Sequence, residues 1–463
     1  MTQTSEADRT DTHRMISELW SALGGKANLS GTVAITGEGA LPSVFAVSDF
    51  AAAAVASAGL ALAEWSEVRS GKLPTVTVDR RLASLWFGFS IAPQGWSLPP
   101  AWDPVAGDYA AADGWIRLHT NAPHHREAAL NVLGTEAERA AVTAAVARWR
   151  ADELETAVVA KGGCAAAMRS EDEWAEHPQG RSVLAEPLVR METGTGAEAF
   201  ARDFEASRPL KGTRVLDLTR VLAGPVATRF LAGFGADVLR IDPPSWEEPG
   251  VVPDVTPGKR CARLDLKSDA GRARFRALLG EADVLVHGYR PDALEALGLG
   301  AEIRAKIRPG LIDVSHDAYG WTGPWANRRG FDSLVQMSSG IAEAGMVAAG
   351  ADRPVPLPVQ ALDHGAGYLL AAAAVRGLSL RQNQGTGSRW RTSLARVGGF
   401  LASHRQGPVA MQIGKPERRD YAGEVEHTDW GPALRLLPPV RLGDVGMKWD
   451  RPAGALGTSP AQW

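Results

Sequence analysis

Two acidic residues each stand at the start of a long run of small apolar residues. Asp363 lies in PLPVQALDHGAGYLLAAAAVRG, and Asp49 lies in LPSVFAVSDFAAAAVASAGLAL. Asp is a frequent N-cap because its oxygens accept hydrogen bonds from the free amides of the first helical turn. A carboxylate at a helix N-terminus can also act as a nucleophile, since the helix dipole favours its ionised form. From the residue types alone, capping is the more common role.

Capping and catalysis are compatible at Asp363. Gly365 and Gly367 carry no side chains, so a bulky substrate is expected to come close to this helix end. The amides of Gly365 and its neighbours would face the oxyanion formed when the carboxylate attacks. At the other run, Phe50 crowds the corresponding position. Asp49 is therefore predicted to be a structural cap, or a vestigial acid left by a duplication.

The composition bounds the function of the 463-residue chain. Hydrophobic residues make up 45% and charged residues 22%, with a formal net charge of −3 and no basic block, which argues against binding to nucleic acid or an anionic membrane. Cys164 and Cys261 cannot form a disulfide framework, and no Cys/His spacing indicates a metal site. The polar N-terminus and the weakly hydrophobic run AAAAVASAGLALA predict a cytoplasmic protein without a signal peptide or membrane span.

From Pro209 onward the chain alternates between strand-like and helix-like segments. GTRVLDL and ADVLRID read as strands that flank a helix in VLAGPVATRFLAGFG, and ADVLVHGY and LIDVSHDAYG continue the rhythm. Such βαβ units predict a parallel sheet covered by helices on both faces. Before this region, DYAAADGWIRLHTN reads as a hairpin-like turn with a short strand, and AEPLVRM reads as a returning strand.

The two Asp-headed runs also suggest an internal repeat. LSGTVAITGEGALPSVFAVSDFAAA aligns with SSGIAEAGMVAAGADRPVPLPVQALDHGAG after a short insertion, and Pro42 precedes Asp49 by the same interval as Pro356 precedes Asp363. A Ser/Thr-Gly turn follows each helix, RSGK in one copy and GTGS in the other. The chain is thus predicted to carry about one and a half copies of a unit.

The segment PLKGTRVLDLTRVLAGPVATRFLAGFGADVLRID resembles the family III CoA-transferases, the group that contains formyl-CoA transferase, carnitine CoA-transferase and α-methylacyl-CoA racemase. The resemblance continues through PGKRCARLDLKS, ADVLVHGYRPDALEALGLG and YGWTGPWANRRGFDSLVQ to the Asp363 helix. It implies a Rossmann-like large domain with a parallel sheet, a small α+β domain, and two chains interlocked as a homodimer. The predicted segments are an extension at 1–26, a partial repeat with the small domain at 27–206, the Rossmann-like domain at 207–400, and a returning segment at 401–463.

Several positions match functional positions of the family. By this resemblance Asp363 corresponds to the catalytic aspartate, which raises nucleophile above cap as its expected role. The resemblance implies that Val221, Lys259, Arg260 and Tyr289 contact CoA, and Arg290 is predicted to bind CoA beside them from its residue type and position. The residues themselves fit that role, because cations and a flat aromatic on loops after parallel strands suit the nucleotide end of CoA, although a solvated surface is an equal reading for Arg290.

Four departures separate this chain from the family pattern. Leu222 stands where the transferases have a glutamine, and Phe331 stands where the racemase has its catalytic histidine ahead of Asp332. The loop after the second strand is shortened to PPSWEEPGVVPDVTPGKR, and the glycine-rich flap of the transferase small domain has no counterpart. Auxiliary roles are predicted for His316, expected in a loop near the site, for His364, and for Gly365.

These features predict an enzyme that moves CoA from an acyl-CoA thioester to a carboxylic acid. Asp363 would form an aspartyl anhydride and then an aspartyl-CoA thioester, with no metal and no permanently bound cofactor, because the CoA thioester is itself the substrate. One alternative is an acyl-CoA racemase or isomerase on the same fold, in which Asp363 removes an α-proton. Another is a catalytically silent CoA-binding protein, for which Leu222 and the missing flap would be signs of lost activity.

Overall fold

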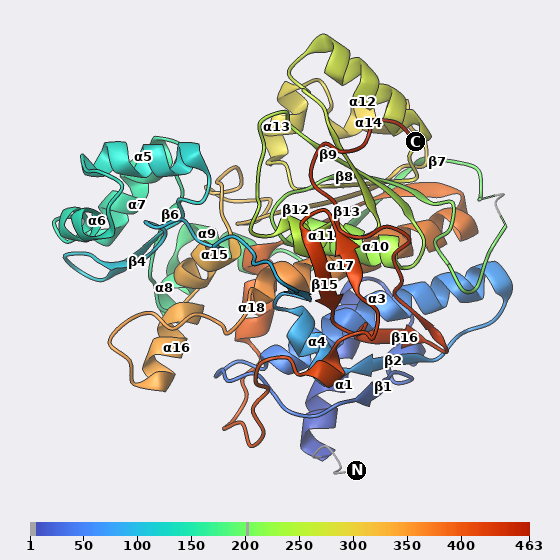
Figure 1. Ribbon diagram of the computed structural model, residues 1–463, viewed down its shortest axis with the longest axis horizontal. Helices are drawn as coiled ribbons and strands as arrows, with labels where there is room; N and C mark the ends of the chain where they lie inside the picture. Colours follow the sequence, from blue (N-terminus) through green and yellow to red (C-terminus); the bar gives the residue numbers. More distant parts are fainter. Residues whose placement is uncertain (1–5, 201–202) are drawn as a thin grey trace.

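The protein is built in layers around one seven-stranded sheet (Figure 1). The computed structural model describes residues 6–200 and 203–463. From the top of Figure 1 downward, a helical layer, the large sheet, two layers of helices and a smaller sheet follow one another, and a separate lobe projects to the side. The lobe contains the small strands and helices between residues 107 and 167.

The large sheet confirms the parallel α/β architecture expected from the sequence. Six neighbouring strands pair in parallel, and a seventh, at the edge, is antiparallel. In sheet order the strands are β10 (Lys259–Arg263), β9 (Asp237–Asp242), β8 (Arg214–Leu218), β11 (Val284–His287), β12 (Ile312–Asp317), β13 (Thr386–Ser393) and β7 (Arg190–Gly196). The order reverses at β8, between β9 and β11, which makes this a doubly wound sheet with a switch point beside β8.

Side-chain alternation along the strands separates the two faces of this sheet. Val215 and Val286 point into the larger core with α10 (Ala223–Gly233) and α17 (Ala361–Gln384). Leu216 points the other way, into a second core with α12 (Asp269–Glu281). Strands that are apolar on both faces need helices on both faces, and the βαβ connections supply them.

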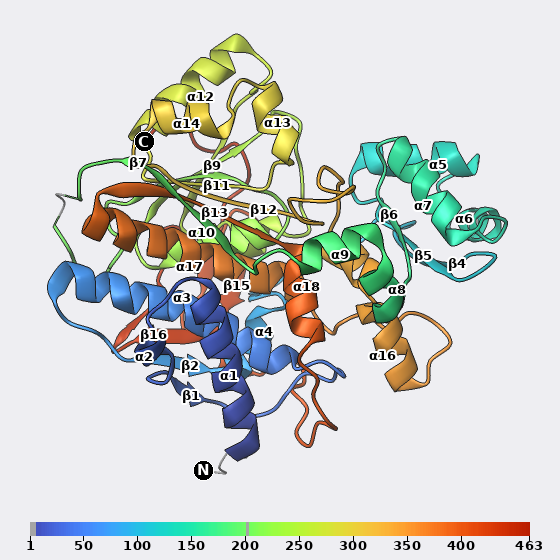
Figure 2. The ribbon, with the colours of Figure 1, turned by 180° about the vertical axis from the view of Figure 1, so that it is seen from behind.

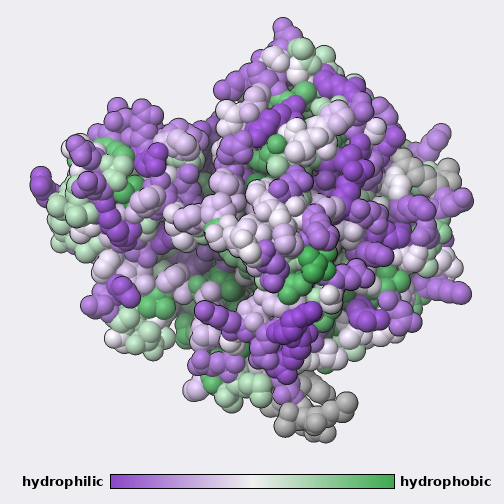
Figure 3. Space-filling model, viewed as in Figure 1, coloured by the Kyte–Doolittle hydropathy of each residue, from purple (hydrophilic) through white to green (hydrophobic). Residues whose placement is uncertain are grey.

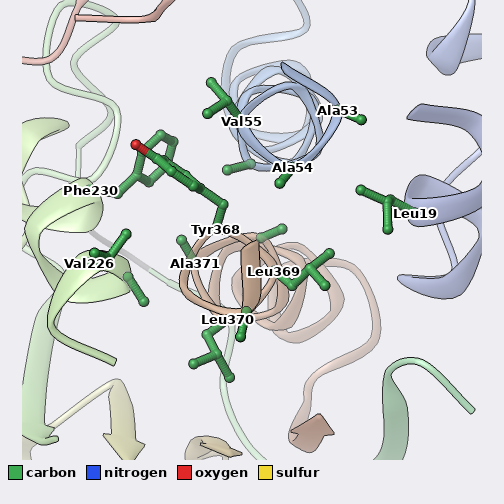
Figure 4. Close-up of a cluster of buried hydrophobic side chains, with 14 of the residues drawn as sticks. Leu19, Ala53, Ala54, Val55, Val226, Phe230, Tyr368, Leu369, Leu370 and Ala371 are labelled. Atoms are coloured by element: carbon green, nitrogen blue, oxygen red, sulfur yellow. The ribbon is translucent and has the colours of Figure 1, made fainter. Parts of the chain in front are cut away.

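Two 24-residue helices, α3 (Val47–Ser70) and α17, pack along each other in the centre of the molecule. Figure 4 shows Ala54 of α3 pointing toward α17, from which Tyr368 and Leu369 project, with helices α10 and α1 (Glu6–Ala22) on either side. Small side chains allow the two backbones to come close, so both helices are buried through most of their length. By length and composition α3 could cross a membrane, with a mean hydropathy of 1.3, but its apolar window is wholly buried inside the fold, where it forms core.

Two small sheets flank the α3 side of the molecule, as Figure 2 shows for β1 and β2 beside α1. Their pairings bring the C-terminal segment back onto the N-terminal half of the chain. One contains β1 (Ala34–Thr36), β2 (Val76–Asp79), β16 (Val440–Leu442) and β17 (Val445–Gly446), and the other contains β14 (Glu426–Thr428), β15 (Gly431–Arg435) and β3 (Ile91–Pro93).

The projecting lobe contains the segment DGWIRLHTN and combines a small sheet with helices. Its sheet of β4 (Gly107–Ala110), β5 (Trp115–Leu118) and β6 (Ala165–Ala167) is covered by α5 (Pro123–Leu133), α6 (Arg139–Val146) and α7 (Ala151–Ala160). Cys164 and Ala166 pack against Leu334 and Met337 of α15 (Asp332–Ser338). The lobe therefore rests on the large domain of its own chain.

Short helices complete the fold. They are α2 (Ala27–Ser30), α4 (Arg80–Trp86), α8 (Glu171–Glu176), α9 (Pro178–Leu184), α11 (Val252–Val255), α13 (Pro291–Ala296), α14 (Ala301–Ile307), α16 (Ile341–Ala349), α18 (Leu394–Ala402) and the 3-10 turn η1 (Arg418–Asp420). One core cluster runs from α1 and α3 through α10 and α17, and β7 joins the large sheet. The packing is therefore continuous across residue 206, where the sequence segments were divided.

The starts and ends of α3 and α17 have the same local geometry. The residues before the helices, Ala46 and Gln360, have φ/ψ of −74°/57° and −75°/64°. Left-handed Gly71 and Gly385 end the helices, and each is followed by a strand parallel to its neighbour and then by a short helix. These parallels agree with the repeat seen in the sequence, and a common origin by duplication stays a prediction.

Candidate active site

The candidate site lies at the carboxyl-terminal edge of the parallel strands. Helix α17 leads into β13, which begins at the opposite edge, so the first turn of α17 lies beside the ends of β8, β11 and β12. Ligands in open α/β sheets bind outside this edge, next to the switch point. Asp363 and the turns after β8 and β11 are thus brought to the same region.

Asp363 is the third residue of α17, and its side chain reaches the start of a second helix. It is 8% exposed, and its carboxylate accepts a hydrogen bond from the backbone N–H of Ala223, the first residue of α10. Two helix N-termini therefore meet at one carboxylate. Free amides and helix dipoles at such ends stabilise negative charge, including charge that develops during a reaction.

A second acid, Asp332, holds the start of α17. Its Oδ2 accepts the backbone N–H groups of Leu362 at 2.9 Å and of Asp363 at 3.0 Å. Its Oδ1 accepts the side-chain amide of Gln336, whose own oxygen accepts the Leu357 N–H at 2.7 Å. Asp332 is thus the group that satisfies the first-turn amides of α17, the capping role that the sequence had left open for Asp363.

The two carboxyl groups disfavour each other's ionisation. Burial and the neighbouring Asp332 raise the pKa of Asp363 well above its usual range, against the opposing effect of the Ala223 N–H. Burial likewise raises the pKa of Asp332 to about 6, although the amides of Asp363 and Gln336 partly offset it. The expectation that the helix N-terminus alone would keep Asp363 readily ionised is therefore wrong, because desolvation and the second acid outweigh the dipole.

Gly365 and Gly367 do not open a path for substrate. A Cβ at Gly365 would overlap the ring of Phe50, and one at Gly367 would overlap the Ala223 carbonyl. The two glycines instead allow α3 and α10 to approach α17. The predicted approach of a thioester over these residues is corrected accordingly, and Phe50 crowds Gly365 itself rather than only its own helix end.

His364 lies in an aromatic layer behind the helix end. It is 2% exposed and stacks on Phe87, with ring centroids 5.3 Å apart. Burial lowers the pKa of His364 to about 3, with Arg229 adding to the effect. The imidazole is therefore neutral at physiological pH and packs as a core aromatic.

His316 is in a strand rather than in the predicted loop. It is the penultimate residue of β12, and a Cβ at Gly288 would come within 2.8 Å of its Nε2, so it lies against the turn after β11. Burial, with His287 adding to it, lowers the pKa of His316 to about 4. Within residues 6–200 and 203–463 neither ring nitrogen has a hydrogen-bond partner, so this neutral imidazole keeps both available at the edge of the site.

The turn after β8 carries the only left-handed non-glycine backbone among the described residues. Val221 has φ of 64°, and its N–H donates a 2.8 Å hydrogen bond to Oε2 of Glu248. Beside it, Arg220 donates to the Tyr289 hydroxyl at 3.0 Å and lies over the ring of Trp246 at 4.8 Å. Backbone strain of this kind is concentrated at functional sites.

Two of the predicted cationic residues lie elsewhere. Lys259 and Arg260 begin β10 instead of occupying a loop after a strand. Lys259 is fully buried and pairs with Asp217 at 3.0 Å, and Arg260 pairs with Asp237 at 2.7 Å. Asp237 and Lys259 begin their parallel strands, so Arg260 is on the edge opposite Asp363 and neither side chain is placed to meet a phosphate there.

Arg290 follows β11 as predicted and remains partly free. Its side chain is 36% exposed, 3.9 Å from Asp292, and donates a long hydrogen bond of 3.3 Å to the Asn327 carbonyl. It precedes α13 at the carboxyl-terminal edge. Of the predicted CoA-binding residues, the structure brings Val221, Tyr289 and Arg290 to the edge where Asp363 lies.

Asp49 is committed to an ion pair. Its two oxygens accept from Arg80 at 3.0 and 2.9 Å, and Thr12 donates to the same carboxylate. Both partners are buried, at 8% and 5% side-chain exposure. It is the third residue of α3 rather than an N-cap, so its structural role is that of a buried counter-ion to Arg80.

The departures from the family pattern occupy the surroundings of the acid pair. Leu222 is the residue before α10 and is 9% exposed. Phe331 stacks on His119 of the small lobe with ring centroids 3.7 Å apart, and His125 meets its edge. Burial lowers the pKa of His119 to about 3, so this is a packed aromatic contact between lobe and large domain.

The face seen in Figure 3 is hollowed between the small lobe and the main body, with apolar residues in the recess. Two shallow pockets lie elsewhere. One, of about 550 Å³, is beside α1 and α18, and the other, of about 520 Å³, is beside η1. Asp363 lines neither pocket. The pockets are therefore separate from the acid pair. No group of three or more metal-ligating side chains is found over the described part of the chain.

The candidate site thus consists of a buried carboxylate where two helices begin, on the edge of a doubly wound sheet at which ligands bind. Residues 210–426 match the model of "CoA-transferase family III". The match contains Asp363, Asp332 and the turns after β8 and β11.

Curated relatives match this chain over part of their length. An acyl-CoA transferase of Gibberella moniliformis is 30% identical over 50% of this chain and 44% of its own. A probable fatty acyl-CoA transferase of Mycobacterium tuberculosis, Rv3272, is 31% identical over 39% and 48%. A succinyl-CoA:glutarate CoA-transferase of Mus musculus is 34% identical over 40% and 45%. The chain thus spans about half the length of the curated relatives it matches.

Among solved structures, the crystal structure of Rv3272 from M. tuberculosis is 30% identical, with a TM-score of 0.40 over 42% of this chain and 57% of that chain.

Three residues that belong to the site were not found from the sequence. Arg220, Trp246 and Glu248 lie in turns that carry no periodic pattern, and their shared position follows only from the pairing of β8 with β9. The available signal was the shortened loop PPSWEEPG, whose aromatic and acids were noted as a departure and not as a site.

Proposed function

We propose that this protein transfers CoA from an acyl-CoA thioester to a carboxylic acid, with the Asp363 carboxylate as nucleophile. The observation that supports it most directly is the position of that carboxylate on the Ala223 N–H, where the first turns of α10 and α17 meet. The match of residues 210–426 to the CoA-transferase family III model, and relatives named as CoA-transferases, support the same chemistry.

In the first half-reaction, an Asp363 oxygen attacks the thioester carbonyl carbon and the C–S bond breaks. This gives an aspartyl anhydride and the CoA thiolate. The thiolate then attacks the aspartyl carbonyl carbon, the anhydride C–O bond breaks, and the donor acid leaves as a carboxylate. Asp363 now carries CoA as a thioester, and no proton has been gained or lost.

In the second half-reaction the acceptor carboxylate attacks the aspartyl thioester and expels the thiolate. The thiolate attacks the acceptor carbonyl of the new anhydride, which gives the new acyl-CoA and restores the Asp363 carboxylate. The amides at the start of α10 and α17 are suited to stabilise the tetrahedral oxyanions. No metal is invoked, because the thiolate is both leaving group and nucleophile.

The raised pKa of Asp363 serves this mechanism. A carboxylate whose conjugate acid is weaker is a stronger nucleophile once it is ionised, in line with Brønsted behaviour. Burial and Asp332 supply that increase, while the Ala223 N–H limits it. Asp363 is thus harder to ionise beside Asp332, but its carboxylate is more nucleophilic once it is ionised.

The decisive experiment traps the enzyme-bound intermediate. Protein incubated with a panel of acyl-CoAs and then with hydroxylamine should acquire a hydroxamate at Asp363, found by peptide mass spectrometry, and Asp363→Asn should acquire none. If the recovered thioester carries solvent deuterium at Cα and no hydroxamate forms, the proposed function becomes racemisation instead of CoA transfer. If the protein binds CoA tightly but exchanges no label between acyl-CoA and any acid, the proposed function becomes CoA binding without catalysis.

We also propose a homodimer in the cytoplasm as the working form. The small lobe packs on α15 of its own chain through Cys164 and Ala166. In the proposed dimer each copy would therefore keep its own lobe next to its own acid pair. Light scattering of the purified protein tests the dimer, and a monomer with full activity would refute it.

A further inference from the structure

The switch point of the sheet contains a carboxylate that already occupies an anion-binding position. The Val221 N–H, presented by a strained left-handed residue, donates to Oε2 of Glu248 at 2.8 Å. Oε1 of the same carboxylate accepts from Arg240, whose side chain is wholly buried in β9. Glu248 itself is only 8% exposed. An acidic side chain of the chain's own loop is thus held by an amide and a guanidinium.

The charge balance of this group is unfavourable for a second anion. Arg240 also donates to both oxygens of Asp242, at 2.8 and 3.1 Å. With both acids ionised, one buried guanidinium therefore faces two carboxylates, and the trio carries one net negative charge. The Val221 N–H compensates part of it. A phosphate that approached this amide would meet like charge, which is costly where water is excluded.

The loop that carries Glu248 is short and locally held. The Val251 and Val252 N–H groups both donate to the Glu248 carbonyl, at 3.1 and 3.2 Å, at the start of α11. Trp246, two residues earlier, covers Arg220. We expect the side chain to leave the Val221 amide together with a loosening of this turn.

We propose that Glu248 is an affinity- and specificity-determining residue for the coenzyme: its carboxylate holds the Val221 amide in the free protein, and an anionic group of CoA must displace it to bind. This inference rests on the proposed function, which brings a CoA thioester to this edge. The exchange of a carboxylate for a phosphate keeps the buried Arg240 guanidinium paired with an anion in both states.

The test compares the affinity for CoA itself, measured by titration calorimetry, in the full chain and two variants. Glu248→Gln removes the competing charge and is expected to bind CoA about tenfold more tightly. Glu247→Gln makes the same change one residue away, where the side chain is 66% exposed and pairs with Arg263, and should stay within about twofold of wild type. Equal or weaker binding by Glu248→Gln would overturn the inference.

The outcomes separate this inference from the proposed function. If all three proteins bind CoA equally, displacement by CoA is refuted and CoA transfer stands. If none of the three proteins binds CoA, both the displacement of Glu248 and the proposed CoA transfer are refuted. Hydrogen exchange of the wild type provides a second measurement that needs no variant: CoA should increase exchange at Val251 and Val252 as the turn loosens, and unchanged or slower exchange there would contradict displacement.

Discussion

The backbone N–H of Asp363 donates a 3.0 Å hydrogen bond to the side chain of Asp332, so one acid holds the other in place. The bond orients the start of α17 and also brings two carboxyl groups close together in a buried site. The first effect fixes the direction of the Asp363 side chain. The second raises the pKa of Asp363, in addition to the effect of burial. Geometry and reactivity of the candidate nucleophile therefore depend on the same residue.

Replacement of Asp332 should move the pH dependence of turnover. Asp332→Asn removes the neighbouring charge, so the pKa of Asp363 falls and its ionised form persists at lower pH. The acid limb of kcat/KM is expected to shift down by about one pH unit. The maximum rate should also fall, because the nucleophile becomes less basic. Rates of label exchange between acyl-CoA and free acid, measured from pH 5 to 9, check both effects.

A purely structural role for Asp332 would give a different result. Loss of the hydrogen bonds from Asp332 to α17 alone would lower the rate at every pH. It would leave the acid limb of the kcat/KM profile at the same pH. Asp49→Asn removes a carboxylate from the corresponding position of α3 and should leave the limb in place.

The two Asp-headed helices should respond in opposite ways to loss of their acids. Asp363→Ala is expected to abolish turnover while the fold remains. Asp49→Ala leaves Arg80 buried without its bidentate partner, which should lower the free energy of unfolding by about 3–5 kcal/mol. Activity of the folded fraction should persist. Denaturant unfolding and label exchange measure the two properties.

A second substitution verifies the cause of the Asp49 effect. Adding Arg80→Met to Asp49→Ala removes the unpaired charge and should recover part of the lost stability. If Asp49→Ala is folded and inactive while Asp363→Ala is active, the assignment of the nucleophile is reversed.

Asp363 should cost stability at neutral pH. Its pKa is raised in the folded state, so its ionisation opposes folding, and the penalty grows as pH rises from the ordinary carboxyl pKa through the raised one. Asp363→Asn is therefore expected to raise Tm at pH 8 by about 2 °C or more. The gain should nearly vanish near pH 3, where the Asp363 carboxyl group is mostly protonated in the folded and in the unfolded protein. Calorimetry at the two pH values measures it, and an equal Tm difference at both would exclude ionisation as its cause.

The sequence predicted the fold where a pattern repeats along the chain. Alternating β-branched strands and helices from Pro209 onward determine a parallel sheet, and β8 to β12 are found there. Local pattern does not show which distant segments share a core. The insertion of α3 beside α17, and of β7 at the sheet edge, depends on packing between residues more than a hundred positions apart.

The candidate site was predicted only in part for the same reason. Asp363 was found because its helix has a recognisable sequence. Lys259 was misplaced because the start of β10 cannot be distinguished from a loop by composition, and a buried Lys–Asp217 pair has no local signature. The role of Asp332 was missed because its partner amides lie about thirty residues away in sequence.

Gly365 provides a direct test of what the glycines beside Asp363 do. A methyl group at this position would overlap the Phe50 ring, so Gly365→Ala should destabilise the protein by about 1–3 kcal/mol through overpacking. Phe50→Leu shortens the opposing side chain, and the double variant should be less destabilised than the sum of the single variants. Because the methyl group would face α3, KM for acyl-CoA in the folded Gly365→Ala protein should stay unchanged. If unfolding free energies prove additive and KM rises instead, Gly365 faces the substrate, and the original prediction of an open approach is restored.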